Sequence, residues 1–415
     1  MTATFFLEFF FMPVSKDKKE LLESFSRTTD EIFSLNEFEE LIDSKKKIRI
    51  KYGVDVTSPY LHIGHAVNLW MMRELQDLGH KVIFLIGDFT TQIGDPTGRS
   101  NTRPIISQSE IDKNAEEFIR QAKMVLRFDD PGLLEVRRNS EWFSKYQLSE
   151  FLKLLSMVTH SRLISRDMFQ RRIKNSEDIY LHEMIYPILQ GYDSYILESD
   201  LTIIGSDQLF NEMLGRFYQQ KFGQKPQIII TTKITQGIDG KAKQSKSLDN
   251  YIGLGHSSRD KFGRCMKIPD GLIVDYLKVY TKVPREKISA IEKEVADDPM
   301  KWKKFLAQEI IKRYHEETSA KNELEWFENT FSKRITPDDI PVLKVNSSEW
   351  VAIDLVNKFF DNSKSSSEVR RLFKQGAVSV NGKNIPLFDE HIEITSGDVV
   401  KVGKRSWFKI KVVGN

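Results

Sequence analysis

Two histidines three residues apart, His62 and His65, are the side chains whose spacing most directly suggests chemistry. An alternating apolar run at 48–54 predicts a strand before them, and an apolar period at 67–77 predicts a helix after them. Both imidazoles then share one face at the N-terminal end of a helix, where backbone N–H groups and the helix dipole favour anions. The pair suits a phosphate that gains charge in a transition state; the structural alternative is that the rings only cap the helix.

A loop at 87–100 is the second candidate site. It follows an almost wholly apolar run at 81–86, which is the pattern of a strand buried on both faces. Open α/β sheets bind ligands at the carboxyl ends of their strands, and this loop lacks the G-x-x-x-x-G-K-[ST] spacing of a P-loop. A long irregular loop at such a place indicates a function, with a solvated turn as the alternative.

Polar residues on an otherwise apolar predicted helix at 185–197 form a third group. Tyr186, Gln190 and Asp193 fall on one side of this helix, and buried polar groups need partners, either structural ones or a ligand. Asp207 lies at the next strand–helix junction and is either an N-terminal capping acid or a ligand-binding one.

Three lysines within six residues, Lys241, Lys243 and Lys246, mark a Gly- and Lys-rich loop at 237–250 that we expect to be mobile. Such a run is ordinarily a solvated charge cluster. Beside a nucleotide-phosphate site, the same charges would neutralise a departing pyrophosphate.

Strand and helix patterns alternate from residue 46 to about 235, which predicts a doubly wound parallel sheet of Rossmann-like α/β type. A single helix is expected over 16–41. A nearly all-helical region and a small α+β unit with an Asn381-Gly382 hairpin turn follow the α/β domain. The predicted domains are an N-terminal extension and helix at 1–45, the α/β domain at 46–250 with an inserted helical segment at about 110–180 and the mobile loop at 240–250, a helical domain at 251–335, a linker at 336–348 and the α+β domain at 349–415.

The composition is that of an ordinary soluble protein, with 415 residues of which 40% are hydrophobic and 29% charged. A net charge of +3 does not by itself indicate nucleic acid. The single cysteine, Cys265, excludes an internal disulfide and a Cys-rich zinc site and fits a reducing, cytoplasmic location. The Phe-rich start at 2–14 lacks signal-peptide features and is shorter than the ~20 residues that span a bilayer. Our hypothesis is that Met12 is the biological start.

Basic residues with interleaved aromatics, Phe373 and Trp407, crowd the C-terminal unit. The basic positions are Arg370, Arg371, Lys374, Lys401, Lys404, Arg405, Lys409 and Lys411. This pattern predicts an RNA-binding surface, with solubility of a small domain as the alternative.

Taken together, these motifs resemble the class I tyrosyl-tRNA synthetases of bacteria over about residues 20–415. Residues 62–65 repeat the first signature of the class, His-Ile-Gly-His, and 243–247 are similar to the second, Lys-Met-Ser-Lys-Ser, with Gln for Met. The helix that carries Tyr186, Gln190 and Asp193 is similar to the family's tyrosine-pocket helix. Gly94-Asp95-Pro96 is similar to the loop that holds the amino group, and 349–415 resembles the S4-type RNA-binding domain of the family.

The resemblance implies a reaction in two steps. The carboxylate of L-tyrosine attacks the α-phosphorus of ATP and releases pyrophosphate, and the tyrosyl group then passes to the terminal ribose of tRNA(Tyr). Chemistry of this kind depends mainly on positioning and charge stabilisation. The resemblance also implies Mg²⁺ that arrives with ATP, no tightly bound cofactor or resident metal, no membrane, and a homodimer with residues 148–174 at its interface.

The site residues that the resemblance implies fall into four groups. The catalytic group is His62, His65, Thr57, Lys243 and Lys246. The ATP-binding group is Asp55, His62, Gly64, His65, Asp207 and Lys246. The tyrosine-binding group is Asp95, Tyr186, Gln190, Asp193 and Gln208, of which Asp193 would accept a hydrogen bond from the phenol. The RNA-binding group is Arg370, Arg371, Lys374, Lys404 and Arg405.

Three residues depart from the family pattern. Lys51 stands where many members have a second tyrosine at the phenol, so phenol recognition would depend on Asp193 and Gln208. Gln244 in the second signature would alter loop packing rather than phosphate charge. Ile204 stands where Gly-Gly is usual, and its side chain could crowd the adenosine site.

Three other functions compete with this one. Tryptophanyl-tRNA synthetases share the fold and both signatures, but the S4-like tail and Asp193 argue against them. A nucleotidyltransferase that acts on small molecules is disfavoured by the basic tail. A diverged duplicate that only binds RNA is disfavoured by the intact His62, His65, Lys243 and Lys246.

Overall fold

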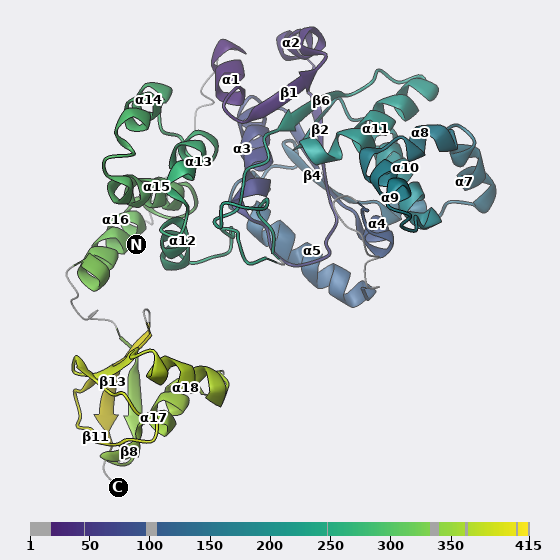
Figure 1. Cartoon of the computed structure of the whole chain (residues 1–415). Helices are drawn as coiled ribbons and strands as arrows, with labels where there is room; N and C mark the ends of the chain where they lie inside the picture. The colour runs from purple at the N-terminus through teal and green to yellow at the C-terminus, as the bar shows by residue number, and fades with distance from the viewer. Residues whose placement is uncertain are drawn as a thin grey trace, which may run out of the picture. The chain divides into compact units, whose positions relative to one another are not determined.

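Figure 1 shows the computed structural model, which describes residues 18–44, 46–96, 106–246, 248–332, 340–361, 364–403 and 406–413. The chain divides into two compact units, Met1–Glu323 and Leu324–Asn415. The Phe-rich start, the end of the 87–100 loop, and the predicted RNA-binding residues Lys404 and Arg405 lie outside the described residues.

The first unit is built on a six-stranded sheet with the order β1-β6-β5-β2-β3-β4. Its strands are β1 (Thr29–Phe33), β2 (Arg49–Val54), β3 (Lys81–Ile86), β4 (Leu134–Arg138), β5 (Leu201–Gly205) and β6 (Ile228–Thr232). Strands β2 to β6 run parallel, and β1 pairs antiparallel with β6 at one edge. The predicted doubly wound, Rossmann-like class is confirmed.

Strand β2 is the point at which the strand order reverses. β3 and β4 extend from one side of it, and β5 and β6 extend from the other. In open α/β sheets, the crevice beyond the carboxyl ends of the strands at such a point is where ligands bind. The order of the strands alone therefore predicts where the ligand site lies.

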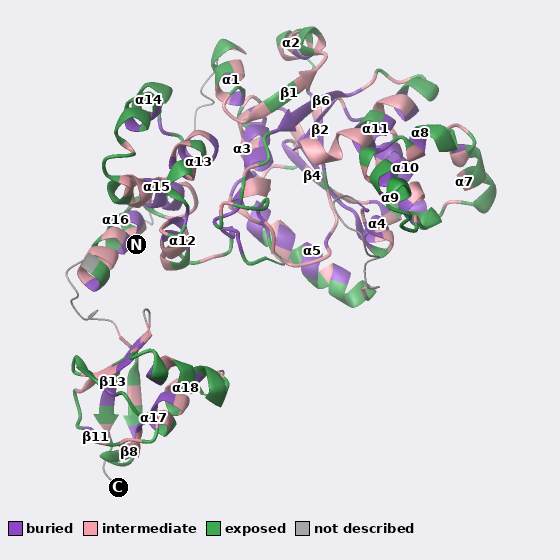
Figure 2. Cartoon of the chain, viewed as in Figure 1, coloured by how far each residue is buried: buried purple, intermediate pink, exposed green. Residues whose placement is uncertain are grey.

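Helices cover both faces of the sheet (Figure 1). α3 (Ile63–Asp77) packs against β3 and β5, whereas α11 (Leu209–Lys221) packs against β5 and β6 and lies along α10 (Leu181–Ile196). Figure 2 shows buried residues on the strands and on the helix sides that face them. The remaining helices of this unit are α1 (Lys18–Phe25), α2 (Leu35–Asp43), α4 (Asp88–Ile93), α5 (Gln108–Ala122), α6 (Ser140–Phe143), α7 (Leu148–Leu155), α8 (His160–Ile164), α9 (Asp167–Lys174), α12 (Ser258–Cys265), α13 (Ile273–Tyr280), α14 (Arg285–Glu294), α15 (Pro299–Tyr314) and α16 (Glu317–Phe327), the last of which runs into the second unit.

The single helix predicted over 16–41 is wrong. The structure has α1 and α2 with β1 between them, and β1 pairs with β6. Glu31 and Thr231, which pair there, are 200 positions apart in the chain. A pairing over that separation leaves no trace in the local period, so tertiary contacts override the helical pattern.

The second unit contains a five-stranded sheet of order β10-β9-β12-β13-β7 and a two-stranded sheet, β11-β8. Its elements are β7 (Val342–Val345), β8 (Glu349–Val351), α17 (Ala352–Phe359), α18 (Ser366–Lys374), β9 (Val378–Val380), β10 (Lys383–Asn384), β11 (His391–Glu393), β12 (Val399–Val402) and β13 (Ser406–Val412). Val369 and Phe373 of α18 and Phe408 of β13 belong to its core. β7 pairs in parallel with β13, so the stretch predicted as a linker, 336–348, includes a strand of this sheet.

Helices α10 and α11 lie close together at Gly191. A Cβ atom added there would lie 2.9 Å from the carbonyl carbon and the Cβ of Leu214 and 3.1 Å from the Gly215 nitrogen. The two contacts at 2.9 Å are shorter than real Cβ atoms accept, and the third is tight. The absence of a side chain at Gly191 therefore sets the spacing of two helices that both carry cavity residues.

We predict that Gly191→Ala destabilises the protein by ~1–3 kcal/mol, because the added methyl group forces α10 and α11 apart in a packed core. Chemical denaturation measures the free energy of unfolding. Gly263→Ala in α12 is the matched control, because a Cβ there meets nothing within 4 Å outside the helix itself. The control should be neutral or slightly more stable, and equal stability of the two variants would contradict the prediction.

Candidate active site

A cavity of about 590 Å³ lies at the carboxyl ends of β2, β3 and β5, at the switch point of the sheet. Every residue that the resemblance assigned to catalysis, ATP or tyrosine lines it. These residues are Asp55, Thr57, His62, Gly64, His65, Asp95, Tyr186, Gln190, Asp193, Asp207, Gln208, Lys243 and Lys246. Of the predicted RNA-binding residues, Arg370, Arg371 and Lys374 lie exposed on α18 in the second unit.

The two histidines sit at the start of α3 and are fixed by its first backbone N–H groups. His62 Nδ1 accepts a hydrogen bond from the Gly64 nitrogen at 3.2 Å, and His65 Nδ1 accepts one from the His62 nitrogen at 3.2 Å. The rings are stacked at a tilt with centroids 3.8 Å apart. Because each Nδ1 is an acceptor, the ring proton resides on Nε2, which leaves that N–H for another partner. The rings therefore cap the helix and also line the cavity.

Burial keeps both imidazoles neutral. It lowers the pKa of His65 to about 3, and the nearby charges of Lys246 and Lys243 add to the effect. The pKa of His62 also falls well below its ordinary value, through burial first and then through His65 and the same two lysines. Gly64 allows this arrangement, because a Cβ there would come within 2.9 Å of the His62 ring.

The two signature lysines of the loop are held by groups of the cavity. Lys243 Nζ forms an ion pair with Asp207 Oδ2 at 2.7 Å, and Lys246 Nζ donates to Ser58 Oγ at 2.6 Å. Lys246 also lies over the Phe118 ring, 5.2 Å from its centroid. The loop therefore brings two cations to the same cavity as the neutral imidazoles.

Gln244, one of the three departures from the family pattern, is buried and attaches this loop to its surroundings. Its Nε2 donates to the Tyr280 hydroxyl at 2.7 Å, and its Oε1 accepts from the Ile252 nitrogen at 3.3 Å. The segment that follows the loop reaches the first signature, because the Ile63 nitrogen donates to the Ile252 carbonyl at 2.9 Å. The sequence pointed to loop packing at Gln244 but not to these partners.

Asp55 and Tyr186 contact each other at the carboxyl end of β2. The Tyr186 hydroxyl donates to Asp55 Oδ2 at 2.9 Å, and Thr90 Oγ1 donates to Asp55 Oδ1 at 2.9 Å. Ile204, the third departure, lines the same cavity at the end of β5 and is buried.

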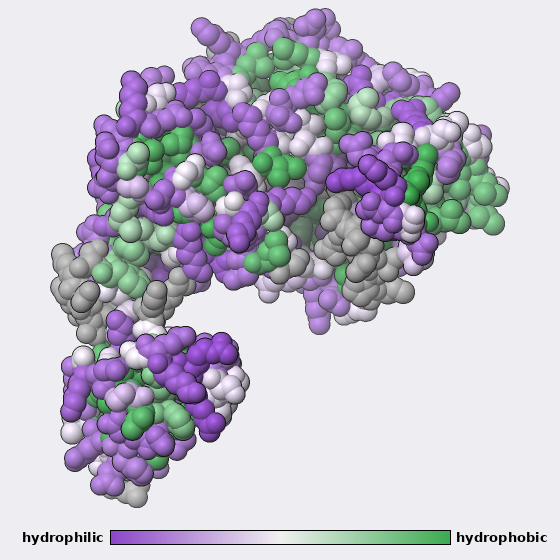
Figure 3. All heavy atoms as spheres, in the orientation of Figure 1, coloured by the Kyte–Doolittle hydropathy of each residue, from purple (hydrophilic) through white to green (hydrophobic). Residues whose placement is uncertain are grey.

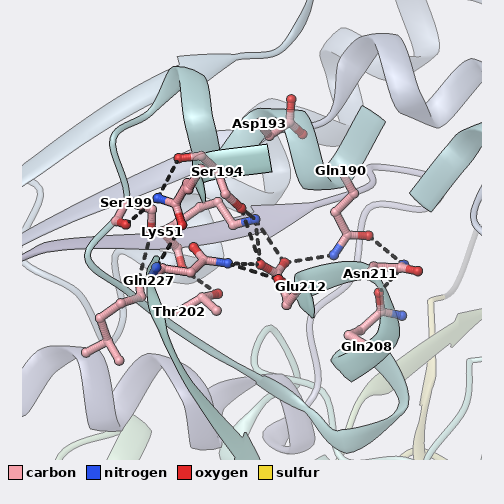
Figure 4. A network of polar contacts seen from close by, with 12 residues as sticks. Lys51, Gln190, Asp193, Ser194, Ser199, Thr202, Gln208, Asn211, Glu212 and Gln227 are labelled. Atoms are coloured by element: carbon pink, nitrogen blue, oxygen red, sulfur yellow. Dashed lines mark hydrogen bonds and ion pairs between the residues drawn. The ribbon is translucent and has the colours of Figure 1, made fainter. Parts of the chain in front are cut away.

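A chain of side-chain amides joins several residues that line the cavity (Figure 4). Gln208 Nε2 donates to Asp95 Oδ2 at 2.7 Å, and Gln208 Oε1 accepts from Asn211 Nδ2 at 3.0 Å. The same Asn211 Nδ2 donates to Gln190 Oε1 at 2.8 Å, and Gln190 Nε2 donates to Glu212 Oε1 at 2.9 Å. Predicted site residues on three different elements are thus joined in one network.

Lys51 and Glu212 form a buried ion pair at the end of this network. Lys51 Nζ lies 2.8 Å from Glu212 Oε2 and donates to Ser194 Oγ at 2.7 Å, and the two charged side chains are only 1% and 2% exposed. Gln227 Nε2 donates to the same carboxylate oxygen, Oε2, at 2.7 Å. Sequence reasoning noted Lys51 only as a departure and missed Glu212, although a lysine in a predicted interior strand requires a buried partner.

Asp193 lies within the cavity wall and points away from the Lys51–Glu212 pair in Figure 4. It accepts hydrogen bonds from Trp142 Nε1 at 3.0 Å and from Asn139 Nδ2 at 3.4 Å. Complete burial raises the pKa of Asp193 to about 8, against the opposing effects of Lys51, Asn139 and Trp142. A carboxyl group in such a place suits a partner that itself hydrogen-bonds, such as a hydroxyl.

Comparison with known proteins first gives the class. A family model described as tRNA synthetases class I (W and Y) matches residues 43–332, which span the whole cavity. The fold and the two signatures therefore define a class I tRNA synthetase. Among solved structures, a mitochondrial tyrosyl-tRNA synthetase of Aspergillus nidulans superposes with a TM-score of 0.62 at 23% identity, covering 75% of this chain and 93% of its own. A tyrosyl-tRNA synthetase of Archaeoglobus fulgidus superposes with a TM-score of 0.57 at 22% identity, covering 74% and 100%.

Curated relatives then give the family. The chain is 42% identical to tyrosine–tRNA ligase 2 of Photorhabdus laumondii over 370 residues, covering 88% of this chain and 92% of the relative. It is 39% identical to tyrosine–tRNA ligase of Thermotoga maritima over 395 residues, covering 94% and 97%. The chain belongs to the tyrosine–tRNA ligase family.

We predict that Lys51→Met lowers the free energy of unfolding by ~3–5 kcal/mol, because it leaves the Glu212 carboxylate buried without its cation. The double variant Lys51→Met/Glu212→Gln should recover stability, since replacing both charges removes the unpaired group. Chemical denaturation of the two single variants and the double variant measures this coupling. Additive effects, with the double variant the least stable, would show that the pair does not interact.

Proposed function

We propose that this protein is a tyrosine–tRNA ligase, which activates L-tyrosine with ATP and transfers the tyrosyl group to the 3′ end of tRNA(Tyr). The observation that carries the proposal is the convergence of both class signatures and the tyrosine-pocket residues on one cavity. The relatives named tyrosine–tRNA ligase support the choice of amino acid.

In this proposal, the adenylation step divides the phosphate contacts between neutral and charged groups. His62 and His65 offer neutral Nε2–H donors to the phosphates, and donors held in place in this way stabilise the negative charge that develops there. Lys243 and Lys246 hold the departing pyrophosphate, for which they exchange their present partners Asp207 and Ser58. Thr57 adds a hydroxyl to the same group.

ATP arrives with Mg²⁺, which neutralises phosphate charge while bound. Asp55 and Asp207 lie at the carboxyl ends of β2 and β5 and are placed to position the ribose and the base of the nucleotide. Gly64 allows the close approach of the nucleotide to the helix start, where a side chain would meet His62.

The amino acid occupies the end of the cavity between α10 and β2. Asp95, Tyr186 and Gln190 offer acceptors to its ammonium group, and Asp193 faces the phenol together with Gln208. Phenylalanine has no hydroxyl to donate to the buried Asp193, which keeps only its bonds from Trp142 and Asn139, and this loss penalises that substrate. Burial raises the pKa of Asp193 to about 8 because it removes the carboxyl group from water. A hydroxyl that hydrogen-bonds to the carboxyl group replaces the lost contact with water.

We further propose a homodimer that uses the inserted helical segment. Large apolar side chains are exposed there: Leu148 and Leu152 on α7, Ile173 on α9, and Leu181 at the start of α10. Figure 3 shows a hydrophobic patch at the edge of the first unit where α7 lies in Figure 1. Such a patch is more apolar than a free surface ordinarily is.

In the described part of the chain, no helix is long and apolar enough to span a bilayer.

ATP–pyrophosphate exchange across a panel of amino acids tests the proposal, and tyrosine alone should support rapid exchange. Lys246→Ala should slow tyrosine-dependent exchange by ~10²–10³-fold, because a preorganised charge on the leaving group is lost. Lys241→Ala is the matched control, since Lys241 belongs to the same loop, is exposed and does not line the cavity. Exchange with tryptophan instead, or an equal effect of both lysines, would contradict the proposed chemistry.

The second unit should be required for tRNA and dispensable for amino-acid activation. We predict that a chain ending at residue 332 keeps tyrosine-dependent exchange, whereas its tRNA charging falls sharply. The cut is placed before β7, because β7 belongs to the sheet of the second unit. Basic residues neutralise RNA phosphates, so tRNA binding by the full chain should also weaken as salt rises.

The matched variant for this truncation is the full chain with Arg370, Arg371 and Lys374 each replaced by alanine. These residues are exposed on α18, so the unit should still fold. Charging by this variant should fall in the same direction as charging by the truncated chain. Equal charging by truncated and full chains would show that the second unit is not the RNA-binding module.

A further inference from the structure

The Lys51–Glu212 pair fixes the direction of hydrogen bonds that lead into the cavity. Paired with the Lys51 ammonium, the Glu212 carboxylate is charged and can only accept hydrogen bonds. Gln190 must therefore turn its NH₂ group towards Glu212, where Nε2 lies 2.9 Å from Oε1. Figure 4 shows Gln190 between Glu212 on one side and Asn211 on the other.

The opposite end of the Gln190 amide is thereby fixed as an acceptor. Its Oε1 takes one hydrogen bond from Asn211 Nδ2 at 2.8 Å, and a carbonyl oxygen has a second lone pair for another donor. Gln190 lines the cavity, so this acceptor is available to a donor group there. If the amide were reversed, its NH₂ group would face an incoming ammonium group and repel it.

The rest of the amide chain reinforces this direction. Asn211 Nδ2 donates to both Gln190 Oε1 and Gln208 Oε1. Gln208 in turn donates to Asp95 at 2.7 Å. The chain begins and ends on a carboxylate. Each glutamine between them must turn its NH₂ group outward to an acid and its carbonyl inward to Asn211.

We propose that Glu212 is a positioning residue for the amino-acid substrate: it orients Gln190 so that a carbonyl oxygen, and not an NH₂ group, meets the α-ammonium group. Lys51 holds the Glu212 carboxylate in place. The inference rests on the proposed function, because it assigns how the same pocket distinguishes an amino acid from a compound without the amine. Glu212 also borders the cavity, and the proposed role is exerted through its hydrogen bond from Gln190 Nε2.

Two ligands test the inference: L-tyrosine, and 3-(4-hydroxyphenyl)propionate, which keeps the phenol and the carboxylate but has no amine. In Glu212→Gln, the new amide accepts or donates, so the orientation of Gln190 is no longer imposed. Tyrosine binding should weaken by about tenfold, whereas binding of the amine-free compound should change by less than about twofold. Equilibrium titration of the full-length protein measures both dissociation constants.

Two further variants keep the test decisive. Lys51→Met/Glu212→Gln removes both charges, so it avoids an unpaired buried ion and should show the same selective loss of tyrosine binding. Gln227→Met removes a different partner of Glu212 that does not line the cavity, and it should leave both affinities unchanged. In a Gln190→Ala background, Glu212→Gln should have no additional effect on tyrosine.

Equal weakening of both ligands would show a general packing role for Glu212. Unchanged tyrosine binding in Glu212→Gln and in the double variant would show that Gln190 is oriented by other groups. If the unaltered protein binds tyrosine and shows tyrosine-dependent pyrophosphate exchange, either result overturns this inference and leaves the proposed function standing. Failure of the unaltered protein in those two assays overturns the proposed function instead.

Discussion

The parallel pairing of β2 with strands on both of its sides is the constraint on which the rest of the molecule depends. Parallel strands end at the same edge, and the chain must leave β2 towards one neighbour and return beside the other. This arrangement opens a crevice at the carboxyl end of β2. The first signature follows β2, Asp95 lies beyond β3, and Asp207 follows β5, so three loops distant in sequence deliver their polar groups to one cavity.

The cavity combines neutral imidazoles with charged lysine side chains. Burial lowers the pKa of His65 to about 3 and that of His62 well below its ordinary value, so the imidazoles remain hydrogen-bond donors without charge. The cations come from a separate loop, through Lys243 and Lys246. Had the rings been charged as well as the lysines, four cations would line one cavity.

The buried Lys51–Glu212 pair carries a desolvation cost that is not needed for stability alone. Desolvation of two charges is expensive, and hydrophobic replacement of such pairs is often neutral or stabilising. Here the carboxylate imposes a direction on the amides of Gln190, Asn211 and Gln208, which an apolar pair could not do. The close approach of α10 and α11 at Gly191 brings these groups within hydrogen-bonding distance.

Local sequence was sufficient for much of this protein. An alternating apolar run at 48–54 predicted β2, and an almost wholly apolar run at 81–86 predicted β3. The His62-to-His65 signature and the lysine loop pointed to residues that line the cavity, because each of those motifs is contiguous in the sequence.

Tertiary structure decided what depends on residues far apart in the chain. β1 was missed because its partner β6 lies 200 positions away, and β7 was missed because it pairs only with β13. Likewise, Lys51 in the sequence was only a substitution for an expected tyrosine. Its partner Glu212 lies 161 positions later, on a helix whose own period gives no reason to single it out. The role of a buried charge can be assigned only when the fold shows its counter-ion. No local sequence pattern indicates which of the many acidic residues is that counter-ion.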